Sequence, residues 1–181
     1  MDDAIAKRLP SAEDLCAMTR ASLQAAFAGE SQAAEKYMVF AEQAEEEGYP
    51  NIAKLFRAIS FAETRHARNH LRVMGGVGST AENLKSAFDG EAFEVDEMYP
   101  AYAEIARMQA MTQASRSVRY ALRSEVDHKR MYADARTKAL DGADIASDTV
   151  SVCVVCGHTV IGDLPDKCLV CSAPRECYQA F

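Results

Sequence analysis

The chain has 181 residues, of which 49% are hydrophobic and 26% are charged, and its formal net charge is −7. This length suits one ordinary domain with a small module, and the apolar content is enough for a packed core. The negative charge argues against a nucleic-acid partner, because phosphate binding needs clustered Lys and Arg. No apolar run is long enough to span a bilayer, and the first residues lack the apolar segment of a signal peptide. We therefore expect a cytoplasmic protein that does not contact a membrane.

Four helices are expected before the small polar segment that follows Leu140, because this region is rich in the good helix formers Ala, Glu, Met and Arg. Glycine and proline mark most of the helix ends, and Ser79 with Glu82 has the spacing of a capping box. The expected bounds are Ser11 to Glu47, Asn51 to Met74, Ser79 to about Ala110, and from there to Leu140. The sequence predicts an all-α bundle in residues 1–140, a linker in residues 141–150 and a loop-rich module in residues 151–181.

The two halves of the helical region are similar in sequence. The matching pairs, offset by 61 or 62 residues, are Gly29-Glu30 with Gly90-Glu91, Phe40-Ala41-Glu42 with Tyr102-Ala103-Glu104, and Glu63-x-x-His66 with Glu125-x-x-His128. We therefore expect two similar helical hairpins that pack as pseudo-symmetric halves of a four-helix bundle.

Each predicted helix carries at least one glutamate on its apolar stripe. Residues spaced alternately three and four apart share one helix face, so these carboxylates point toward the interior. The stripes are Leu23, Phe27, Glu30, Ala34, Tyr37, Ala41; Ile52, Phe56, Ile59, Glu63, His66, His70, Val73; Leu84, Phe88, Glu91, Glu94, Met98, Tyr102; and Val118, Leu122, Glu125, His128, Tyr132. Burying unpaired carboxylates is unfavourable, and no Lys or Arg lies on these stripes. Bound metal is the simplest compensation.

The spacing of these acids and histidines favours a two-metal site. Glu-x-x-His presents an oxygen and a nitrogen on one helix face, where both can reach one ion. Ferritin-like di-iron or di-manganese bundles use one Glu from each of two helices and Glu-x-x-His from each of the other two. Here these residues are Glu30, Glu91, Glu63 with His66, and Glu125 with His128. A single Glu-x-x-His is usually a solvated helix face, but two copies at matching repeat positions favour a metal site, and the oxygen-rich donor set suits iron or manganese.

Six cysteines are present, and in a reducing cytoplasm they predict metal ligands rather than disulfides. Two Cys-x-x-Cys knuckles, Cys153 with Cys156 and Cys168 with Cys171, are separated by eleven residues. Four thiolates in this spacing form a tetrahedral site that fits zinc or a single iron. The remaining two cysteines lie outside the pattern and are interpreted as ordinary thiols.

The stretches AFAGESQAAEKY, FAETRHARNHL, GEAFEVDEMYP and SEVDHKRMY resemble the metal-binding helices of rubrerythrins, and the likeness extends to the cysteine-containing tail. The resemblance implies a ferritin-like four-helix bundle with a small C-terminal rubredoxin-like domain. The iron ligands that it implies are Glu30, Glu63, Glu91, Glu94, Glu125 and His128. It also implies that Glu94 binds iron in the oxidised state, that His66 replaces Glu94 on reduction, and that Tyr37 and Tyr99 hydrogen-bond the ligands.

The leading hypothesis is a peroxidase that protects against oxidative stress. Hydrogen peroxide would be reduced to water at two iron ions in the bundle, for which manganese is the alternative. Electrons would arrive through one iron in the four-cysteine site, for which zinc is the alternative. No dinucleotide-binding fingerprint is visible, so an NAD(P)H-dependent reductase or a rubredoxin is the expected electron donor. The other hypotheses are a ferroxidase or iron-handling protein of the ferritin type, which needs no electron-supplying module, and a zinc-stabilised binding protein with a vestigial site.

The segment between the second and third predicted helices is short. In ferritin-like bundles these helices run parallel, so their link crosses the bundle, and a helix of roughly 22 residues is about 33 Å long. The segment from Gly75 to Thr80 reaches only about 20 Å when fully extended. We therefore predict a homodimer in which each chain's hairpins pair with those of its partner.

Overall fold

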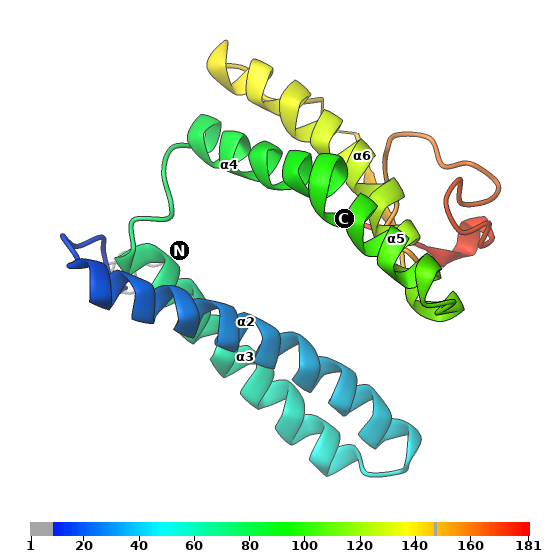
Figure 1. Ribbon diagram of the computed structural model, residues 1–181, viewed down its shortest axis with the longest axis horizontal. Helices are drawn as coiled ribbons and strands as arrows, with labels where there is room; N and C mark the ends of the chain where they lie inside the picture. The colour runs from blue at the N-terminus through cyan, green and yellow to red at the C-terminus, as the bar shows by residue number, and fades with distance from the viewer. Residues whose placement is uncertain (1–8, 147) are drawn as a thin grey trace. The chain divides into compact units, whose positions relative to one another are not determined.

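The described residues, 9–146 and 148–181, form helices over most of the chain and a small sheet near its C-terminus in this computed structural model (Figure 1). The helices are α2 (Ala17–Glu46), α3 (Pro50–Val73), α4 (Thr80–Phe93), the π-helical turn η1 (Glu94–Met98), α5 (Tyr99–Met108) and α6 (Thr112–Leu140). The module contains β1 (Val150–Cys153), β2 (Thr159–Ile161), the 3-10 turn η2 (Arg175–Cys177) and β3 (Tyr178–Ala180). The chain divides into two compact units, one ending at Gly78 and one beginning at Ser79. In the part of the chain described, no helix is long and apolar enough to cross a membrane.

Helices α2 and α3 form an antiparallel hairpin that is held together by small side chains (Figure 1). Ala41 and Ala53 are fully buried and cluster with Ala44, and the ring of Phe56 packs against them. Such small residues let two helices approach closely. Farther along the same interface the hydroxyl of Ser60 donates a hydrogen bond of 2.9 Å to the carbonyl of Ala34, so that the buried polar group is satisfied.

The turn of this hairpin was predicted correctly, but the start of α2 was not. Gly48 ends α2 in the left-handed conformation at φ 82°, and Pro50 opens α3. The predicted helix start at Ser11 is wrong, because α2 begins at Ala17. The backbone N–H of Glu13 instead donates to the carbonyl of Val73 at 3.2 Å. Cys16 has extended backbone at φ −64° and ψ 157°, so the helix begins after it, and the segment before it hydrogen-bonds to the end of α3.

The third predicted helix contains a π-helical turn that the helical periodicity did not predict. The turn η1 lies between α4 and α5, and Pro100 follows it. Proline has no N–H to donate to the carbonyl four residues earlier, and its ring crowds that carbonyl. A locally wider turn accommodates the proline without ending the helix, which is a common origin of π-bulges and kinks.

The π turn changes which residues of α5 face inward. Tyr102 was predicted on the core-facing stripe, but it is 49% exposed, whereas Ala106 is buried. One extra residue in a turn rotates all later side chains around the helix axis. The predicted stripe therefore holds through Met98, which is half-buried, and within this hairpin Tyr102 is not covered.

Helix α6 packs against α4, η1 and α5 in the second unit. The turn that precedes it lies at Ala110, which has φ 53°, so the weakly marked boundary near this residue is confirmed. A hydrogen-bonded ion pair of 2.8 Å joins Lys129 Nζ on α6 to Asp96 Oδ2 in η1. This contact holds the π turn against α6.

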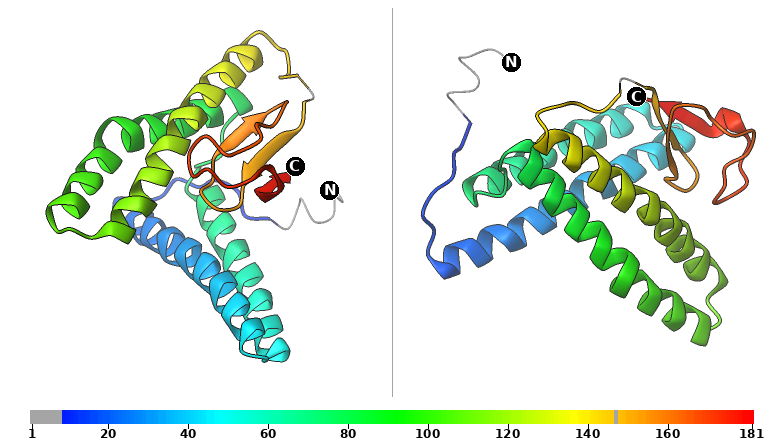
Figure 2. Two further views of the ribbon diagram at one scale, coloured as in Figure 1. Left: turned by 90° about the vertical axis from the view of Figure 1, so that its right-hand side faces the viewer. Right: turned by 90° about the horizontal axis from the view of Figure 1, so that it is seen from above.

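The C-terminal module is a three-stranded antiparallel sheet with the strand order β2-β1-β3. Figure 2 shows these strands beside α6, and β2 makes the closest approach. Helix α6 ends at Leu140 and β1 begins at Val150, so the intervening residues include the predicted linker. The division into residues 1–140, 141–150 and 151–181 as separate domains stays a prediction.

The capping box at the start of α4 gives a test of local stability. The N–H of Glu82 donates to Ser79 Oγ, and the N–H of Ser79 donates to Glu82 Oε2 at 2.7 Å. We expect Ser79→Ala to lower the free energy of unfolding by about 1 kcal/mol, because it leaves a helix-start N–H unpaired. Urea denaturation followed by circular dichroism measures this. Ser79→Thr keeps the hydroxyl and is the control; an equal loss in both variants would contradict a role of the hydrogen bond.

Candidate metal centres

The first hairpin brings Glu30 from α2 together with Glu63 and His66 from α3. One donor atom from each lies within 4.8 Å of the others. His66 Nδ1 is 2.8 Å from Glu63 Oε2 and 3.9 Å from Glu30 Oε1. The distance between His66 and Glu63 is set by their spacing of three residues on one helix. The distance between His66 and Glu30 is set by the packing of α2 on α3. The side chain of His66 is 54% exposed, far more than the 18% of Glu63.

The second hairpin repeats this arrangement with Glu91 from α4 and with Glu125 and His128 from α6. His128 Nδ1 is 2.5 Å from Glu125 Oε2 and 4.0 Å from Glu91 Oε1. The side chain of His128 is 24% exposed, so it is better covered than its counterpart in the first hairpin. The repeat that was predicted from sequence therefore places the same three donors in the same geometry twice.

Both groups of donors fit a metal ion. An ion with bonds of about 2.1 Å can touch donors that lie up to roughly 4.2 Å apart, and every histidine–carboxylate distance above is within this limit. Two carboxylates and one imidazole form a hard, negatively charged set that suits iron or manganese. The residue-by-residue assignment of ligands stays a prediction.

Electrostatic repulsion in the second hairpin also favours a bound cation. The pKa of Glu91 is raised from its ordinary 4.5 to about 7, first by burial, then by the charge of Glu125 and a hydrogen bond with it, and then by Glu94. The pKa of Glu94 is also raised, by burial and by Glu125, although the charge of His128 opposes the shift. Neighbouring carboxylates repel one another when all of them are ionised, and a bound cation stabilises the ionised form by neutralising this charge.

The π turn brings Glu94 and Tyr99 to the same side of the third helix. In a turn with i→i+5 hydrogen bonds, residues five apart come to lie above one another, and the N–H of Tyr99 donates to the carbonyl of Glu94. Burial, followed by the charges of Glu94, Glu125 and Glu91, raises the pKa of the Tyr99 hydroxyl. The sequence Tyr99-Pro100 was the local signal for this turn, since a proline inside a helical pattern indicates a break or a kink.

Tyr37, the corresponding tyrosine of the first hairpin, packs among aromatic rings. Its ring centroid is 6.2 Å from that of Phe40 and 6.1 Å from that of Phe56. Hydrogen bonds from Tyr37 and Tyr99 to metal ligands stay predictions.

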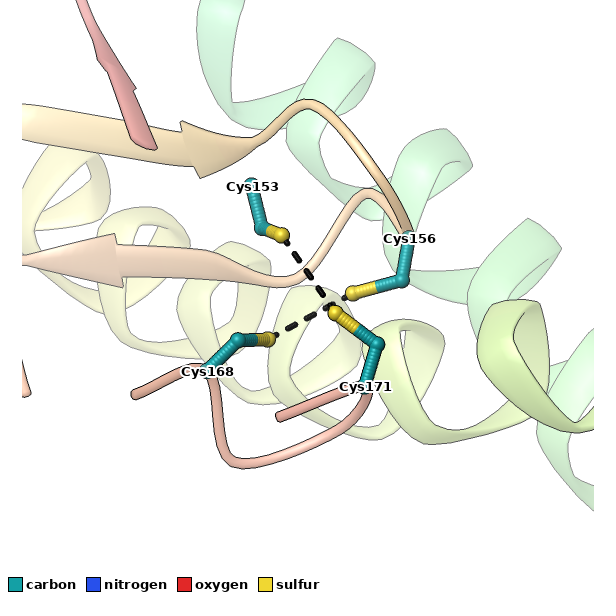
Figure 3. A group of neighbouring side chains, drawn as sticks. All are labelled: Cys153, Cys156, Cys168 and Cys171. Atoms are coloured by element: carbon teal, nitrogen blue, oxygen red, sulfur yellow. Dashed lines mark hydrogen bonds between the residues drawn. The ribbon is translucent and has the colours of Figure 1, made fainter. Parts of the chain in front are cut away.

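The four predicted thiol ligands Cys153, Cys156, Cys168 and Cys171 converge in the module, and Figure 3 shows their sulfur atoms facing one another. The Sγ atoms of Cys153 and Cys171 are 3.6 Å apart, and those of Cys156 and Cys168 are 3.5 Å apart. A tetrahedral site with metal–sulfur bonds of about 2.3 Å has edges of about 3.8 Å, so the pocket is already close to the required size.

Donors around Cys168 stabilise its thiolate form. Burial acts to raise the pKa of this thiol, but N–H groups of the second knuckle, beginning with that of Cys171, and the hydroxyl of Tyr178 outweigh it and lower the pKa to about 6. A thiolate is the form that binds metal. The module thus prepares its sulfur ligands by hydrogen bonding as well as by position.

Sequence reasoning missed the contacts between the module and α6. The hydroxyl of Ser124 donates to the carbonyl of Cys156 at 3.2 Å, and His128 Nε2 lies 2.8 Å from Thr159 Oγ1. The only signal was the polar pair His158-Thr159 directly after the first knuckle. Cys156, a predicted thiol ligand, and His128, a predicted ligand in the bundle, therefore both take part in this interface.

The comparisons with known proteins agree with this architecture. The rubrerythrin family model matches residues 22–136. Rubrerythrin-2 of Clostridium acetobutylicum is 38% identical over 91% of this chain and 97% of its own length. Nigerythrin of Nitratidesulfovibrio vulgaris is 30% identical over 90% of this chain and 86% of its own length. A solved structure described as the fully reduced, all-ferrous state of nigerythrin aligns with a TM-score of 0.54 at 29% identity, covering 94% of this chain and 90% of that chain. These findings confirm the predicted fold class, a helical ferritin-like fold with a rubredoxin-like module.

The raised pKa of Glu91 predicts how the metal-free protein responds to pH. The folded state holds this proton up to about pH 7, whereas the unfolded chain releases it near 4.5. Stability should therefore fall as the pH rises from 4.5 to about 7, because the unfolded state then binds fewer protons than the folded state. Urea denaturation of metal-free protein across this range measures the slope, and Glu91→Gln should flatten it. An unchanged slope in Glu91→Gln would show that another group is responsible.

Proposed function

The chain belongs to the rubrerythrin family, and we propose that it is a peroxidase that reduces hydrogen peroxide with electrons supplied through its four-cysteine module. The overall reaction consumes one peroxide, two electrons and two protons and forms two waters. Two iron ions bound by the carboxylates and histidines of the bundle would supply the electrons that break the O–O bond. The same reaction gives the protein its proposed role in oxidative-stress protection in the cytoplasm.

The contact between the module and α6 carries this proposal. The hydroxyl of Ser124, which is only 1% exposed, lies 3.2 Å from the carbonyl of Cys156 and 3.1 Å from that of Tyr120, so both carbonyls share its proton. Ser124 directly precedes Glu125, a carboxylate of the second half-site. One hydrogen bond therefore links Cys156, which carries a predicted thiol ligand, to Ser124, the neighbour of Glu125 in the sequence. A short path of this kind supports electron delivery, which an iron-storage protein does not need.

The surroundings of the second half-site support proton delivery. Because its pKa is raised, the hydroxyl of Tyr99 keeps its proton at neutral pH beside Glu94 and Glu91. It can therefore donate a hydrogen bond to an oxygen atom in the site. In the first hairpin, the exposed side chain of His66 has room to move, which supports its proposed exchange with Glu94 as a ligand.

The surface around the cysteine knuckles supports an external electron donor. The intervening side chains Val154, Val155 and Leu169 are 66%, 53% and 76% exposed. Exposed apolar side chains next to a redox centre suit the docking of a small redox protein. We propose a rubredoxin or an NAD(P)H-dependent reductase as this donor.

The proposal predicts how the colour of the thiolate-bound iron returns. The iron-loaded protein is reduced without oxygen and mixed rapidly with hydrogen peroxide or with oxygen, while the absorbance of the four-cysteine iron is followed. We expect fast reoxidation by peroxide and much slower reoxidation by oxygen, because electrons leave the module through the bundle. Ser124→Ala should slow reoxidation without altering the metal content, because it removes the hydrogen bond to Cys156.

Faster reoxidation by oxygen than by peroxide would overturn the proposed peroxidase activity. It would indicate a ferroxidase of the ferritin type. Absence of colour, with zinc in the module, would exclude electron delivery through the four cysteines. Ser124→Thr keeps a hydroxyl and is the control for packing at this buried position.

We further propose that the two half-sites are completed by a second copy of the chain. If α3 and α4 run parallel with their ligands at one level, Val73 lies about 10 Å beyond His66 and Thr80 lies about 16 Å before Glu91. The connector must therefore run back by about 26 Å along the helix axis, besides crossing from one helix to the other. The connector reaches at most about 25 Å when fully extended. It is not fully extended, because Gly75 and Gly76 donate back to carbonyls of α3. A swapped dimer removes this conflict.

Each hairpin by itself also leaves apolar side chains uncovered. On the first hairpin, Phe40, Ile52 and Ile59 are 47%, 47% and 38% exposed. Exposed apolar side chains that gather in a patch commonly mark an interaction site. The second hairpin of another chain is the matching half, because it repeats the ligand pattern.

Complementation between two defective chains tests the swapped dimer. One chain carries Glu63→Ala and His66→Ala, and the other carries Glu125→Ala and His128→Ala. In a swapped dimer of the two, one bundle joins both intact hairpins, so co-expression should restore iron binding and peroxidase activity that neither chain has alone. Without swapping, every bundle contains one damaged hairpin and nothing is restored. Light scattering that finds a monomer with a full metal complement would also exclude the dimer.

A further inference from the structure

The loop after the first cysteine knuckle contacts α6 at three places. The contacts are Ser124 Oγ to Cys156 O at 3.2 Å, Asp127 Oδ2 to His158 Nε2 at 3.5 Å, and His128 Nε2 to Thr159 Oγ1 at 2.8 Å. All three α6 residues lie within one turn of Glu125. The module therefore docks beside the half-site through the loop that carries one of its own thiol ligands.

The hydroxyl of Thr159 has a defined direction in this contact. It donates its only proton to the carbonyl of Gly157 at 3.1 Å. When Nδ1 of His128 binds an ion, its Nε2 carries the ring proton and donates to the hydroxyl oxygen of Thr159 at 2.8 Å. The other ring nitrogen, Nδ1, is the atom that faces Glu125 and Glu91.

We propose that Thr159 is a positioning residue for the metal site of the second hairpin. Its hydroxyl holds the imidazole of His128 with Nε2 protonated and Nδ1 directed at the ion. Histidine ligands generally need such a partner for their second nitrogen, which fixes the tautomer and the ring orientation. Here the partner comes from the other metal-binding module of the chain. Docking of the module thus completes the bundle's ligand geometry, whatever substrate the bundle turns over.

The first hairpin provides an internal comparison. Among residues 9–146 and 148–181, the Nε2 atom of His66 has no hydrogen-bond partner, and its side chain is 54% exposed against 24% for His128. The two histidines occupy equivalent positions in the repeat. Only the one that touches the module is held at both nitrogens.

A cavity next to Thr159 allows the hydrogen bond to be tested by the rate at which the Nε2 proton of His128 exchanges with solvent. The cavity has a volume of about 710 Å³, and Asp127, His158 and Thr159 are among the residues that line it. If the hydroxyl is removed, water from this cavity can reach Nε2 of His128. The proton on Nε2 should then exchange with solvent much faster.

Valine at position 159 removes the hydroxyl while keeping the branched shape. Thr159 lies in β2 opposite Val152, where a β-branched residue favours the strand. Thr159→Val should therefore preserve the sheet. Thr159→Ser restores a hydroxyl without the methyl group and separates hydrogen bonding from packing.

The test uses the full chain loaded with zinc, which is diamagnetic, and labelled with ¹⁵N. In the wild type and in Thr159→Ser, we expect an Nε2–H signal of His128 that is protected from solvent exchange. In Thr159→Val, this protection should be lost, and the zinc affinity of the site, followed through the His128 signals during chelator competition, should fall roughly tenfold. The solvent exchange of backbone amides in α2 and α3 should be the same in all three proteins.

Three results would overturn the proposal. The first is a His128 signal and a zinc affinity that do not change in Thr159→Val. The second is an equal loss in Thr159→Val and Thr159→Ser, which would indicate packing. The third is a parallel rise in the exchange of backbone amides in α2 and α3, which would indicate general loosening of the bundle. Because none of these measurements uses peroxide, they do not depend on the proposed peroxidase activity.

Discussion

The structure depends most on the repulsion between carboxylates that helical packing brings together. Glu91, Glu125 and Glu94 lie on neighbouring helices, and burial together with their proximity raises the pKa of Glu91 to about 7. Such a cluster is unfavourable without a cation and becomes a strong binding site with one. The features around it serve this arrangement: small residues let α2 and α3 approach, and the π turn before Pro100 brings Tyr99 to the side of Glu94. The lysine–aspartate contact between α6 and η1 holds that turn in place.

The sequence predicted those parts of the site that local geometry determines. A Glu-x-x-His pair on a helix and a Cys-x-x-Cys knuckle each place two donors together whatever the rest of the chain does, so both half-sites and the four-cysteine group were found. Features set by distant residues were missed. The segment before α2 is not helical and its Glu13 N–H bonds to Val73 at the end of α3, and a π turn interrupts the third predicted helix before Pro100. The docking of Thr159 on His128 joins residues 31 positions apart, which no periodicity reveals.

The repeat is symmetric in its ligands but asymmetric in their support. His66 and His128 have nearly the same distances to their carboxylates, yet only His128 is held by a second hydrogen bond. An imidazole held at both nitrogens keeps one orientation, whereas an imidazole held at one nitrogen can turn about its side-chain bonds. The difference arises from the module, because it covers one hairpin of the repeat and contributes Thr159 there. Duplication of the hairpin alone would produce two histidines with the same contacts. The contact with the module restricts the imidazole of His128 and leaves that of His66 without this restriction.

This asymmetry has a consequence for electron flow if the hairpins exchange between chains. The module contacts α6 of its own chain through Ser124 and His128, so it stays with the second hairpin. In a swapped dimer, that hairpin forms its bundle with the first hairpin of the partner. Each complete site would then combine an anchored histidine and a module from one chain with a movable histidine from the other. Electrons would then enter every site through the module that contacts its anchored histidine, His128.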